Sequence, residues 1–288
     1  MYQITVKYPV SKVDIAIEKL YLFDIYNVFY EAPIEVTTTE YGYGYYEKNN
    51  EIIDLKIVVE TDNEEEVNRQ LNIIKESLEV SEVTVTKIDI PSFETSFEPI
   101  DLNNDWIIAA PDYDAKDKSK INFIPQGAFG TGLHETTQDC LRFILEEDFN
   151  DKTVLDIGAG SGILSLAASI KGAKNVTALD IRDVKDEVEY NASLNGLNNI
   201  QVVVGDALNG EITLDKDFDC IFINIGGEEL QGFMDFINSH LKEKGKLLIS
   251  GLVEWSFYKV IDEVISYGYK VKDKKQSNEW CTALLDKE

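Results

Sequence analysis

The stretch VLDIGAGSGIL at positions 154–164 constrains the fold of this 288-residue chain most strongly. A hydrophobic run typical of a buried strand passes directly into Gly158, Gly160 and Gly162 and then into an apolar run with helical periodicity. Such a turn is expected to leave backbone amides at a helix N-terminus open to a ligand. The dinucleotide fingerprint needs glycines spaced G-x-G-x-x-G, and Ile163 occupies its last position here. A nicotinamide or flavin enzyme is therefore disfavoured.

Strand-like and helix-like segments alternate along residues 121–288. The run NVTALDI is followed by VKDEVEYNASLNG, for example, and FDCIFINIG is followed by EELQGFMDFINSHLK. This alternation predicts an α/β fold with a doubly wound, mostly parallel sheet of seven strands and helices on both faces. The last two strand-like runs are close enough to form a hairpin, so one strand is expected to be antiparallel.

Residues 1–90 follow a different pattern. Two helical runs separate strand-like runs in the order βαββαβ, which predicts a smaller α+β, ferredoxin-like domain. The second strand is expected in PIEVTTTEYGYGYYE at 33–47, after a helical run over 11–31. Residues 91–120 lose this periodicity, contain three prolines and are interpreted as a linker. The expected domains are thus 1–90 and 121–288.

The composition limits the partners and the compartment. The chain has 53 acidic against 27 basic residues, a net charge of −26, which disfavours direct nucleic-acid binding and would steer a basic partner inward. Acidity that serves only solubility explains this charge equally well. No apolar stretch approaches the roughly 18 residues of a membrane span, so a cytoplasmic protein without a membrane partner is expected. Three separated cysteines and two histidines provide no zinc ligand set, so no metal is expected.

The glycine turn also has the form D-x-G-x-G-x-G, beginning at Asp156. This form resembles motif I of class I S-adenosylmethionine (SAM) methyltransferases, which implies that the turn passes beneath SAM with Asp156 near its methionine end. Asp180 ends the next strand, at the separation expected for a carboxylate that accepts hydrogen bonds from both ribose hydroxyls. Asp206 follows the third strand, where class I enzymes place an acid beside the adenine amino group. Either acid alone could instead be a surface or capping residue.

Asn224 closes the fourth strand and is the candidate on the substrate side. At the carboxyl edge of such a sheet its amide oxygen can accept a hydrogen bond from an amine and direct the nitrogen lone pair at the methyl sulfonium. A turn residue before Gly226 and Gly227 is the structural alternative. The asparagine alone does not separate a protein amine from a small-molecule or nucleobase amine.

Six motifs in order resemble the PrmA family, the methyltransferases of ribosomal protein L11: GAFGTGLHETT, VLDIGAGSGIL, VTALDI, YNASLNG, FINIGGEEL and LLISGLV. The resemblance covers essentially the whole chain. It implies an N-terminal substrate-recognition domain, a linker and a C-terminal SAM domain. It also implies that the glycine-rich loop closes over the methionyl end of SAM. The expected cofactor-binding residues are Phe129, Gly130, Thr131, Gly132, His134, Asp156, Gly158, Gly160, Gly162, Asp180, Asp206 and Asn224.

The expected reaction is transfer of methyl groups from SAM to lysine ε-amines or an N-terminal α-amine of ribosomal protein L11, leaving S-adenosylhomocysteine. Asn224 is the expected catalytic residue because it would orient the amine, and His134 is expected to order the loop rather than act as a base. The sequence departs from the family at Pro125-Gln126, at Leu133 and in IGGEEL after Asn224, which leaves the substrate open. The alternatives are a methyltransferase of the same fold for another protein or a small amine, a noncatalytic SAM-responsive module and, third, an oxidoreductase.

Overall fold

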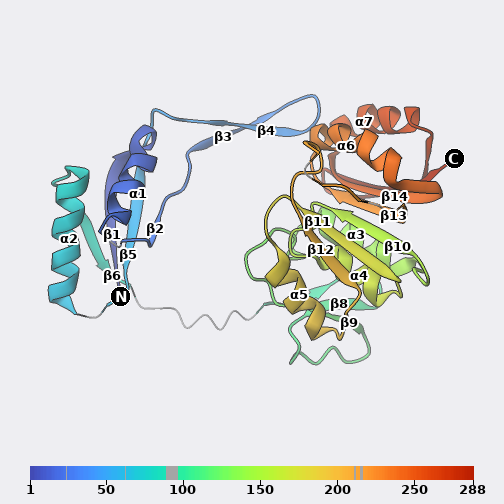
Figure 1. Ribbon diagram of the computed structural model, residues 1–288, viewed down its shortest axis with the longest axis horizontal. Coiled ribbons are helices and arrows are strands. Elements are labelled where there is room, and N and C mark those ends of the chain that lie inside the picture. Colours follow the sequence, from blue (N-terminus) through green and yellow to red (C-terminus); the bar gives the residue numbers. More distant parts are fainter. Residues whose placement is uncertain (24, 62, 89–96, 211, 215–216) are drawn as a thin grey trace. The chain divides into compact units, whose positions relative to one another are not determined.

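The computed structural model describes residues 1–23, 25–61, 63–88, 97–210, 212–214 and 217–288 (Figure 1). The chain divides into two compact units. One consists of Met1–Thr37 and Tyr43–Thr95, and the other of Thr38–Gly42 and Ser96–Glu288. Each unit has its own hydrophobic core.

The first unit contains a four-stranded antiparallel sheet in the order β2-β5-β1-β6. Two helices pack on it, α1 and α2, and the core between them contains Ile4, Leu20, Leu55 and Ile74. Period-2 burial along β1 and β5 explains the strands, because every second side chain points into this core. The elements are β1 (Tyr2–Pro9), a 3-10 turn (Val10–Lys12), α1 (Val13–Tyr21), β2 (Val28–Phe29), β5 (Ile52–Val59), α2 (Glu64–Leu78) and β6 (Thr84–Lys87).

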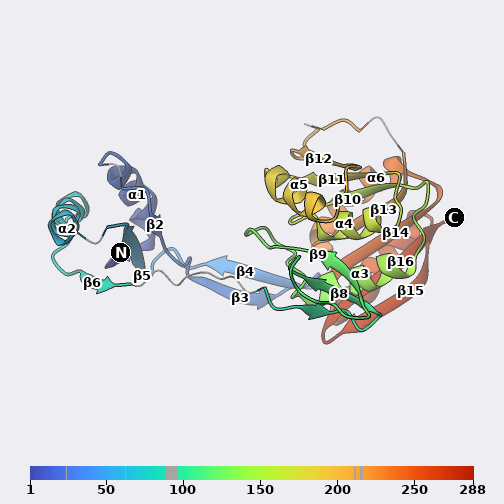
Figure 2. The same cartoon turned by 90° about the horizontal axis from the view of Figure 1, so that it is seen from below.

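The second strand of this sheet differs from the sequence prediction. It is the short β2, which was expected to be helical, and the predicted single strand over 33–47 is a hairpin of β3 (Ile34–Thr38) and β4 (Tyr43–Glu47). Figure 2 shows these two strands side by side. They form their own two-stranded sheet and are largely exposed. Their aromatic and β-branched residues therefore predict strand conformation correctly but do not predict burial in the core of the main sheet. The predicted strand end at 89–90 lies outside the described residues.

The second unit is built on a seven-stranded sheet in the order β12-β11-β10-β13-β14-β16-β15. All neighbours are parallel except at β16, which runs antiparallel to β14 and β15, so the predicted α/β fold with one antiparallel strand is confirmed. Its strands are β10 (Thr153–Ile157), β11 (Asn175–Asp180), β12 (Ile200–Val204), β13 (Phe218–Asn224), β14 (Leu241–Val253), β15 (Tyr269–Ser277) and β16 (Trp280–Lys287).

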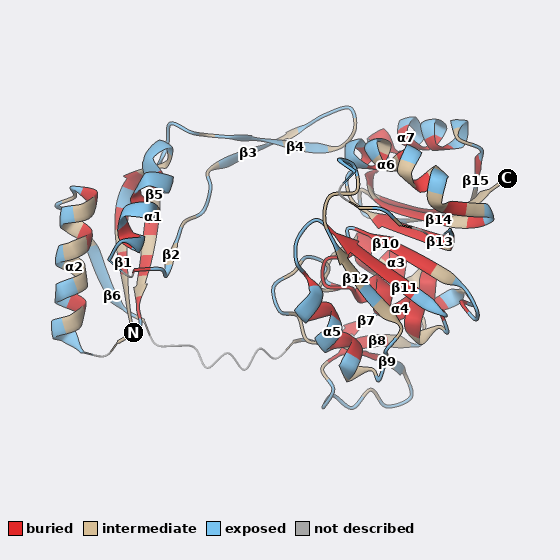
Figure 3. Cartoon of the chain, viewed as in Figure 1, coloured by how far each residue is buried: buried red, intermediate tan, exposed pale blue. Residues whose placement is uncertain are grey.

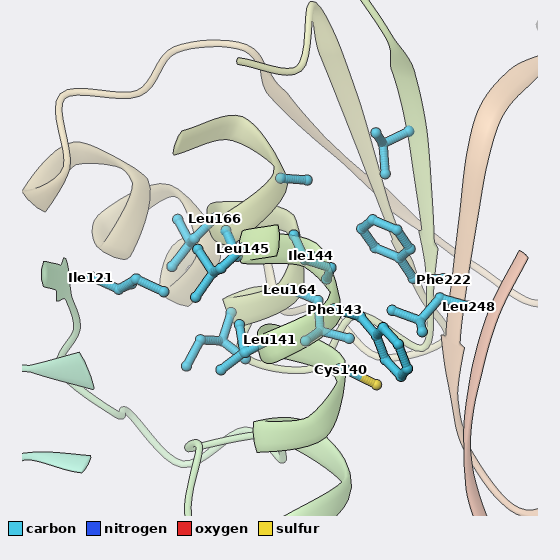
Figure 4. Packing of buried hydrophobic residues seen from close by; sticks show 14 of the residues in the cluster. Ile121, Cys140, Leu141, Phe143, Ile144, Leu145, Leu164, Leu166, Phe222 and Leu248 are labelled. Atoms are coloured by element: carbon cyan, nitrogen blue, oxygen red, sulfur yellow. The ribbon is translucent and has the colours of Figure 1, made fainter. Parts of the chain in front are cut away.

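Helices cover both faces of this sheet, and its central strands are buried (Figure 3). On one face, side chains of α3 and α4 pack against sheet residues such as Phe222 and Leu248 (Figure 4). On the other face, α6 and α7 bury Met234, Val260 and their neighbours against β13, β14 and β16. The helices are α3 (Glu135–Glu146), α4 (Ile163–Ile170), α5 (Lys185–Leu194), α6 (Gly227–His240) and α7 (Glu254–Ser266).

The segment expected to be a linker over 91–120 contains strands. From residue 97 onward it enters the second unit, where β7 (Ile100–Asp101), β8 (Trp106–Ala109) and β9 (Ser119–Asn122) form a three-stranded sheet. Ile108 and Ile121 are fully buried in the same core as α3 and α4. These strands are two to four residues long, which is too short for a period-2 pattern to be visible in the sequence. Residues 91–96 lie outside the described part of the chain.

The order of the strands in the sheet indicates where a ligand site is expected. The chain runs from β10 outward to β11 and β12 and then crosses back to β13 on the other side of β10. Such a switch point opens a crevice at the carboxyl ends of the strands, where ligands bind in open α/β sheets. Gly158, Asp180, Asp206 and Asn224 all lie at these ends.

Candidate functional site

The turn between β10 and α4 is closely packed against the protein itself. Gly158, Gly160 and Gly162 have φ values of 70°, 53° and 77°, which glycine adopts without strain. A Cβ on Gly160 would lie 2.4 Å from the carbonyl oxygen of Phe129. The backbone conformation thus favours glycine at all three positions, and at Gly160 the close approach of the loop that contains Phe129 also leaves no room for a Cβ.

The sequence predicted that the amides of this turn would be open to a ligand, and the structure shows that they are not. Gly158 and Ala159 donate to the Leu179 carbonyl at 2.8 and 3.0 Å, and Gly160 donates to Asp180 Oδ2 at 2.9 Å. Ser161 donates to the Phe129 carbonyl and Gly162 to the Ala159 carbonyl, both at 2.8 Å. The turn folds back onto β11 and onto the glycine loop, so its five amides are satisfied within the protein.

Asp180 is the best-defined acid of the site. Its carboxylate is 7% exposed and receives one backbone amide on each oxygen, from Gly160 on Oδ2 and from Arg182 on Oδ1, both at 2.9 Å. A carboxylate has about four lone-pair positions, so each oxygen retains acceptor capacity. This geometry is compatible with acceptance of two further hydrogen bonds from adjacent hydroxyls.

A pocket of about 270 Å³ brings Gly158, Asp180 and Asp206 together. Asp206 Oδ1 also accepts the amide of Leu208 at 2.8 Å, which holds the loop after β12. The two acids face an otherwise apolar lining, a combination typical of a small-molecule site. The apolar lining is Ile157, Leu179, Ile181, Ala207, Leu208, Ile225 and Phe233.

Asp156 lies apart from this pocket, in the core beneath the turn. It is 1% exposed, and its Oδ2 accepts the Ser165 hydroxyl at 2.7 Å. Burial raises the pKa of Asp156 to about 6, the hydrogen bonds from Ser165 oppose this rise, and the charge of Asp180 adds to it. The geometry joins the end of β10 to the first turn of α4, which is a structural task.

The glycine loop, residues 123–134, lies against the turn. The carbonyls of Phe129 and Gly130 accept hydrogen bonds from the amide and the hydroxyl of Ser161, both at 2.8 Å. A Cβ on Gly132 would lie 2.7 Å from Ile108 Cδ1. Part of the loop's glycine content is therefore explained by close packing within the protein. Its exposed side lines a second hollow, formed by Gly127, Ala128, Phe129, Gly130, Thr131, Leu133, His134, Glu135 and Arg182.

His134 caps α3. Its Nδ1 accepts the amide of Thr136 at 3.3 Å and lies 2.8 Å from the Thr136 hydroxyl, and its ring contacts Trp280 edge-on with centroids 4.9 Å apart. An N-cap that fixes the end of the loop is in keeping with a loop-ordering role.

Asn224 is the last residue of β13 and pairs with Ser250 in the sheet. Its chain neighbour Ile225 lines the 270 Å³ pocket. The structure thus groups Gly158, Asp180 and Asp206 in one pocket, and Asn224 precedes a lining residue of that pocket in the chain without lining it. It groups Phe129, Gly130, Thr131 and His134 in the second hollow, and Arg182, two residues after Asp180, belongs to that hollow.

Three functional candidates were missed in the sequence. Glu187 and Asn191 on α5 bind the backbone of the glycine loop, and only their i, i+4 spacing on a polar helix could have indicated a shared face. Thr137 is buried in the first turn of α3, and its hydroxyl has no hydrogen-bond partner among the described residues.

Within the described ranges, no group of three or more His, Cys, Asp and Glu side chains could hold a metal ion. No helix in those ranges is both long and apolar enough to cross a bilayer.

Comparison with known proteins gives consistent matches. The family model described as "Ribosomal protein L11 methyltransferase (PrmA)" matches residues 1–288. A ribosomal protein L11 methyltransferase of Thermoanaerobacter sp. (strain X514) is 33% identical over 238 residues, 76% of this chain and 75% of the relative. One from Fusobacterium nucleatum is 39% identical over 163 residues, 56% of this chain and 52% of the relative. The crystal structure of a ribosomal protein L11 methylase from Lactobacillus delbrueckii subsp. bulgaricus is 32% identical and matches with a TM-score of 0.59, covering 66% of this chain and 98% of that one.

Proposed function

Because the chain belongs to the PrmA family and is therefore a SAM-dependent methyltransferase, we propose that it methylates lysine ε-amines or the N-terminal α-amine of ribosomal protein L11. The relatives named above are L11 methyltransferases, which supports the substrate. Family membership sets aside the noncatalytic module and the oxidoreductase. The proposal concerns the protein substrate, its amine and the residues that act on it.

The pocket that joins Gly158, Asp180 and Asp206 carries the placement of the cofactor. In this proposal Asp180 holds the ribose hydroxyls, Asp206 lies beside the adenine amino group and the apolar lining contacts the adenine ring. Phe129, Gly130, Thr131, Gly132 and His134 form the loop that closes over the methionyl end. Gly160 leaves room for the loop backbone at Phe129, and Gly162 leaves room for Val188 of α5. Asp156 anchors the turn to α4.

In this reaction the protein has to orient a neutral amine, because the cofactor supplies the electrophile. When bound, SAM supplies a methyl group on a positively charged sulfur, an electrophile that needs no further activation. Asn224 accepts a hydrogen bond from the substrate amine through its amide oxygen and so orients the nitrogen lone pair. The amine must be neutral, and a lysine with a pKa of about 10.4 is mostly charged at pH 7, so the site must favour the deprotonated amine.

We further propose that residues 1–90 dock the protein substrate. The first unit has its own sheet and core, as expected of a separate recognition module. The net charge of −26 supports a basic substrate through electrostatic steering.

Intact-mass spectrometry tests the proposal. Ribosomal protein L11 of the same organism is incubated with SAM and the wild-type chain, and peptide mapping then locates the modified amines. Steps of one methyl mass are expected with the wild type. None is expected with Asp180→Ala, which loses the acceptor of the Gly160 amide as well as the proposed ribose contact. Circular dichroism must show that this variant is folded. A wild-type protein that binds SAM but leaves L11 unmodified would redirect the search to other protein amines or a small amine.

A further inference from the structure

We infer that Glu187 is a positioning residue for SAM binding: its buried carboxylate holds the backbone of the glycine loop in the conformation that lies over the β10–α4 turn. This inference rests on the proposed placement of the cofactor at the turn and loop. It concerns a residue outside the predicted site.

Glu187 lies in the first turn of α5 and is 8% exposed. Its Oε1 accepts the amide of Gln126 and its Oε2 accepts the amide of Ala128, both at 3.0 Å. One carboxylate thus holds two alternate amides at the start of the loop. Hydrogen bonds to a charged, buried acceptor are stronger than those between neutral groups.

Glu187 is one end of a ladder of side chains along α5. Asn191 Oδ1 accepts the amide of Ile124 at 2.9 Å, and Asn195 Oδ1 accepts the amide of Asn122 at 2.9 Å. Glu187, Asn191 and Asn195 are spaced i, i+4, i+8 and so share one face of the helix. Their side chains satisfy the amides of every second residue from 122 to 128, the set that a neighbouring strand would otherwise satisfy.

The ladder ends where the contacts with the turn begin. Ala128 is the last residue bound by α5, and the carbonyls of the next two residues, Phe129 and Gly130, accept from Ser161. The loop is therefore held from one side by Glu187 and from the other by Ser161. Gly127 and Gly130 have positive φ values, and glycine has many other accessible backbone conformations. Loss of the Glu187 contacts is therefore expected to lower the population of the conformation that can bind the cofactor.

Glu187→Gln tests the inference with a side chain of nearly the same shape. An amide has one oxygen, so one of the two backbone amides loses its acceptor and faces the NH₂ group. Two controls separate the possible causes. Glu189→Gln makes the same substitution at an exposed position of α5, and Asn195→Ala breaks the ladder at the end remote from the glycine loop.

Two measurements are made on the full chain: SAM affinity by isothermal titration calorimetry, and hydrogen exchange of residues 123–130 without ligand. Glu187→Gln should bind SAM at least about tenfold more weakly and exchange faster at residues 126–128. Glu189→Gln should match the wild type. Asn195→Ala should lower the melting temperature and leave the SAM affinity within about twofold.

Unchanged SAM affinity in Glu187→Gln, with binding abolished in Asp180→Ala, would overturn this inference and leave the proposed site intact. Equal losses of affinity in Glu187→Gln and Asn195→Ala would also overturn it, because the ladder would then matter only for stability. Unchanged affinity in Asp180→Ala would instead contradict the placement of the cofactor.

Discussion

At the scale of single residues, two neighbouring acids differ in environment. Asp180 opens onto a pocket and receives two backbone amides, whereas Asp156 is enclosed in the core with Ser165 as its partner. From the sequence both acids were expected at the cofactor, Asp156 near its methionine end and Asp180 at its ribose hydroxyls. The structure separates the two: Asp180 lines the 270 Å³ pocket, whereas Asp156 is bonded to Ser165 in the core, a position that depends on the packing of α4 over the turn.

The raised pKa of Asp156 predicts a pH dependence of stability. Its pKa of about 6 in the folded state exceeds the 3.8 of an ordinary aspartate, so the folded state binds more protons between these values. Its contribution to stability is therefore fully present below pH 4 and is lost as the pH rises through 6. Asp156→Asn removes the buried charge and should gain stability over the wild type across this range, by at most about 3 kcal/mol at pH 7. Urea unfolding from pH 4 to pH 7 measures the difference, and a difference that is constant with pH would contradict the prediction.

At the scale of elements, sequence patterns predicted those parts that are long or rich in glycine. The parallel strands β10, β11 and β13 are near-continuous apolar runs, and the turn after β10 is marked by its glycines. The short strand β2 and the strands β7–β9 were not predicted, because strands of two to four residues outside a longer apolar run carry too little periodicity. The hairpin β3–β4 was predicted as one strand, because its turn is not marked by a break in the strand-like residues. The contacts of α5 with the glycine loop were missed because they join segments about 60 residues apart.

The contact between the turn and the glycine loop can be tested with two alanine substitutions. Gly160 has a φ of 53° and would place a Cβ 2.4 Å from the Phe129 carbonyl, whereas Gly196 has a φ of 66° and open space around its Cβ position. Gly196→Ala should cost about 1 kcal/mol through backbone strain alone. Gly160→Ala should destabilise more and also weaken SAM binding, because the glycine loop must move. Denaturant unfolding and calorimetry measure both effects, and identical behaviour of the two variants would show that the contact is unimportant.

At the scale of the whole molecule, charge is the property that bears on the protein substrate. The net charge of −26 should attract a basic protein over distances longer than any direct contact. We expect kcat/KM for ribosomal protein L11 to fall by about tenfold or more when NaCl is raised from about 0.05 to 0.5 M, because the Debye length shortens. The value of kcat at saturating substrate should change little and serves as the control. A kcat/KM that is insensitive to salt would assign the acidity to solubility alone.

Because Thr38–Gly42 belong to the second unit, the first unit cannot be exchanged cleanly by a single recombination event. These residues contact α7: the Thr39 carbonyl accepts from Trp255 at 3.4 Å, and Glu40 forms an ion pair with Lys259 at 2.6 Å. In a protein whose two units are each one continuous segment, a single crossover between them exchanges a complete unit. Here a crossover near residue 95 would also replace part of the partner surface of α7. Replacement of residues 1–95 would therefore remove these contacts of α7, whereas replacement of residues 1–37 and 43–95 alone would keep them.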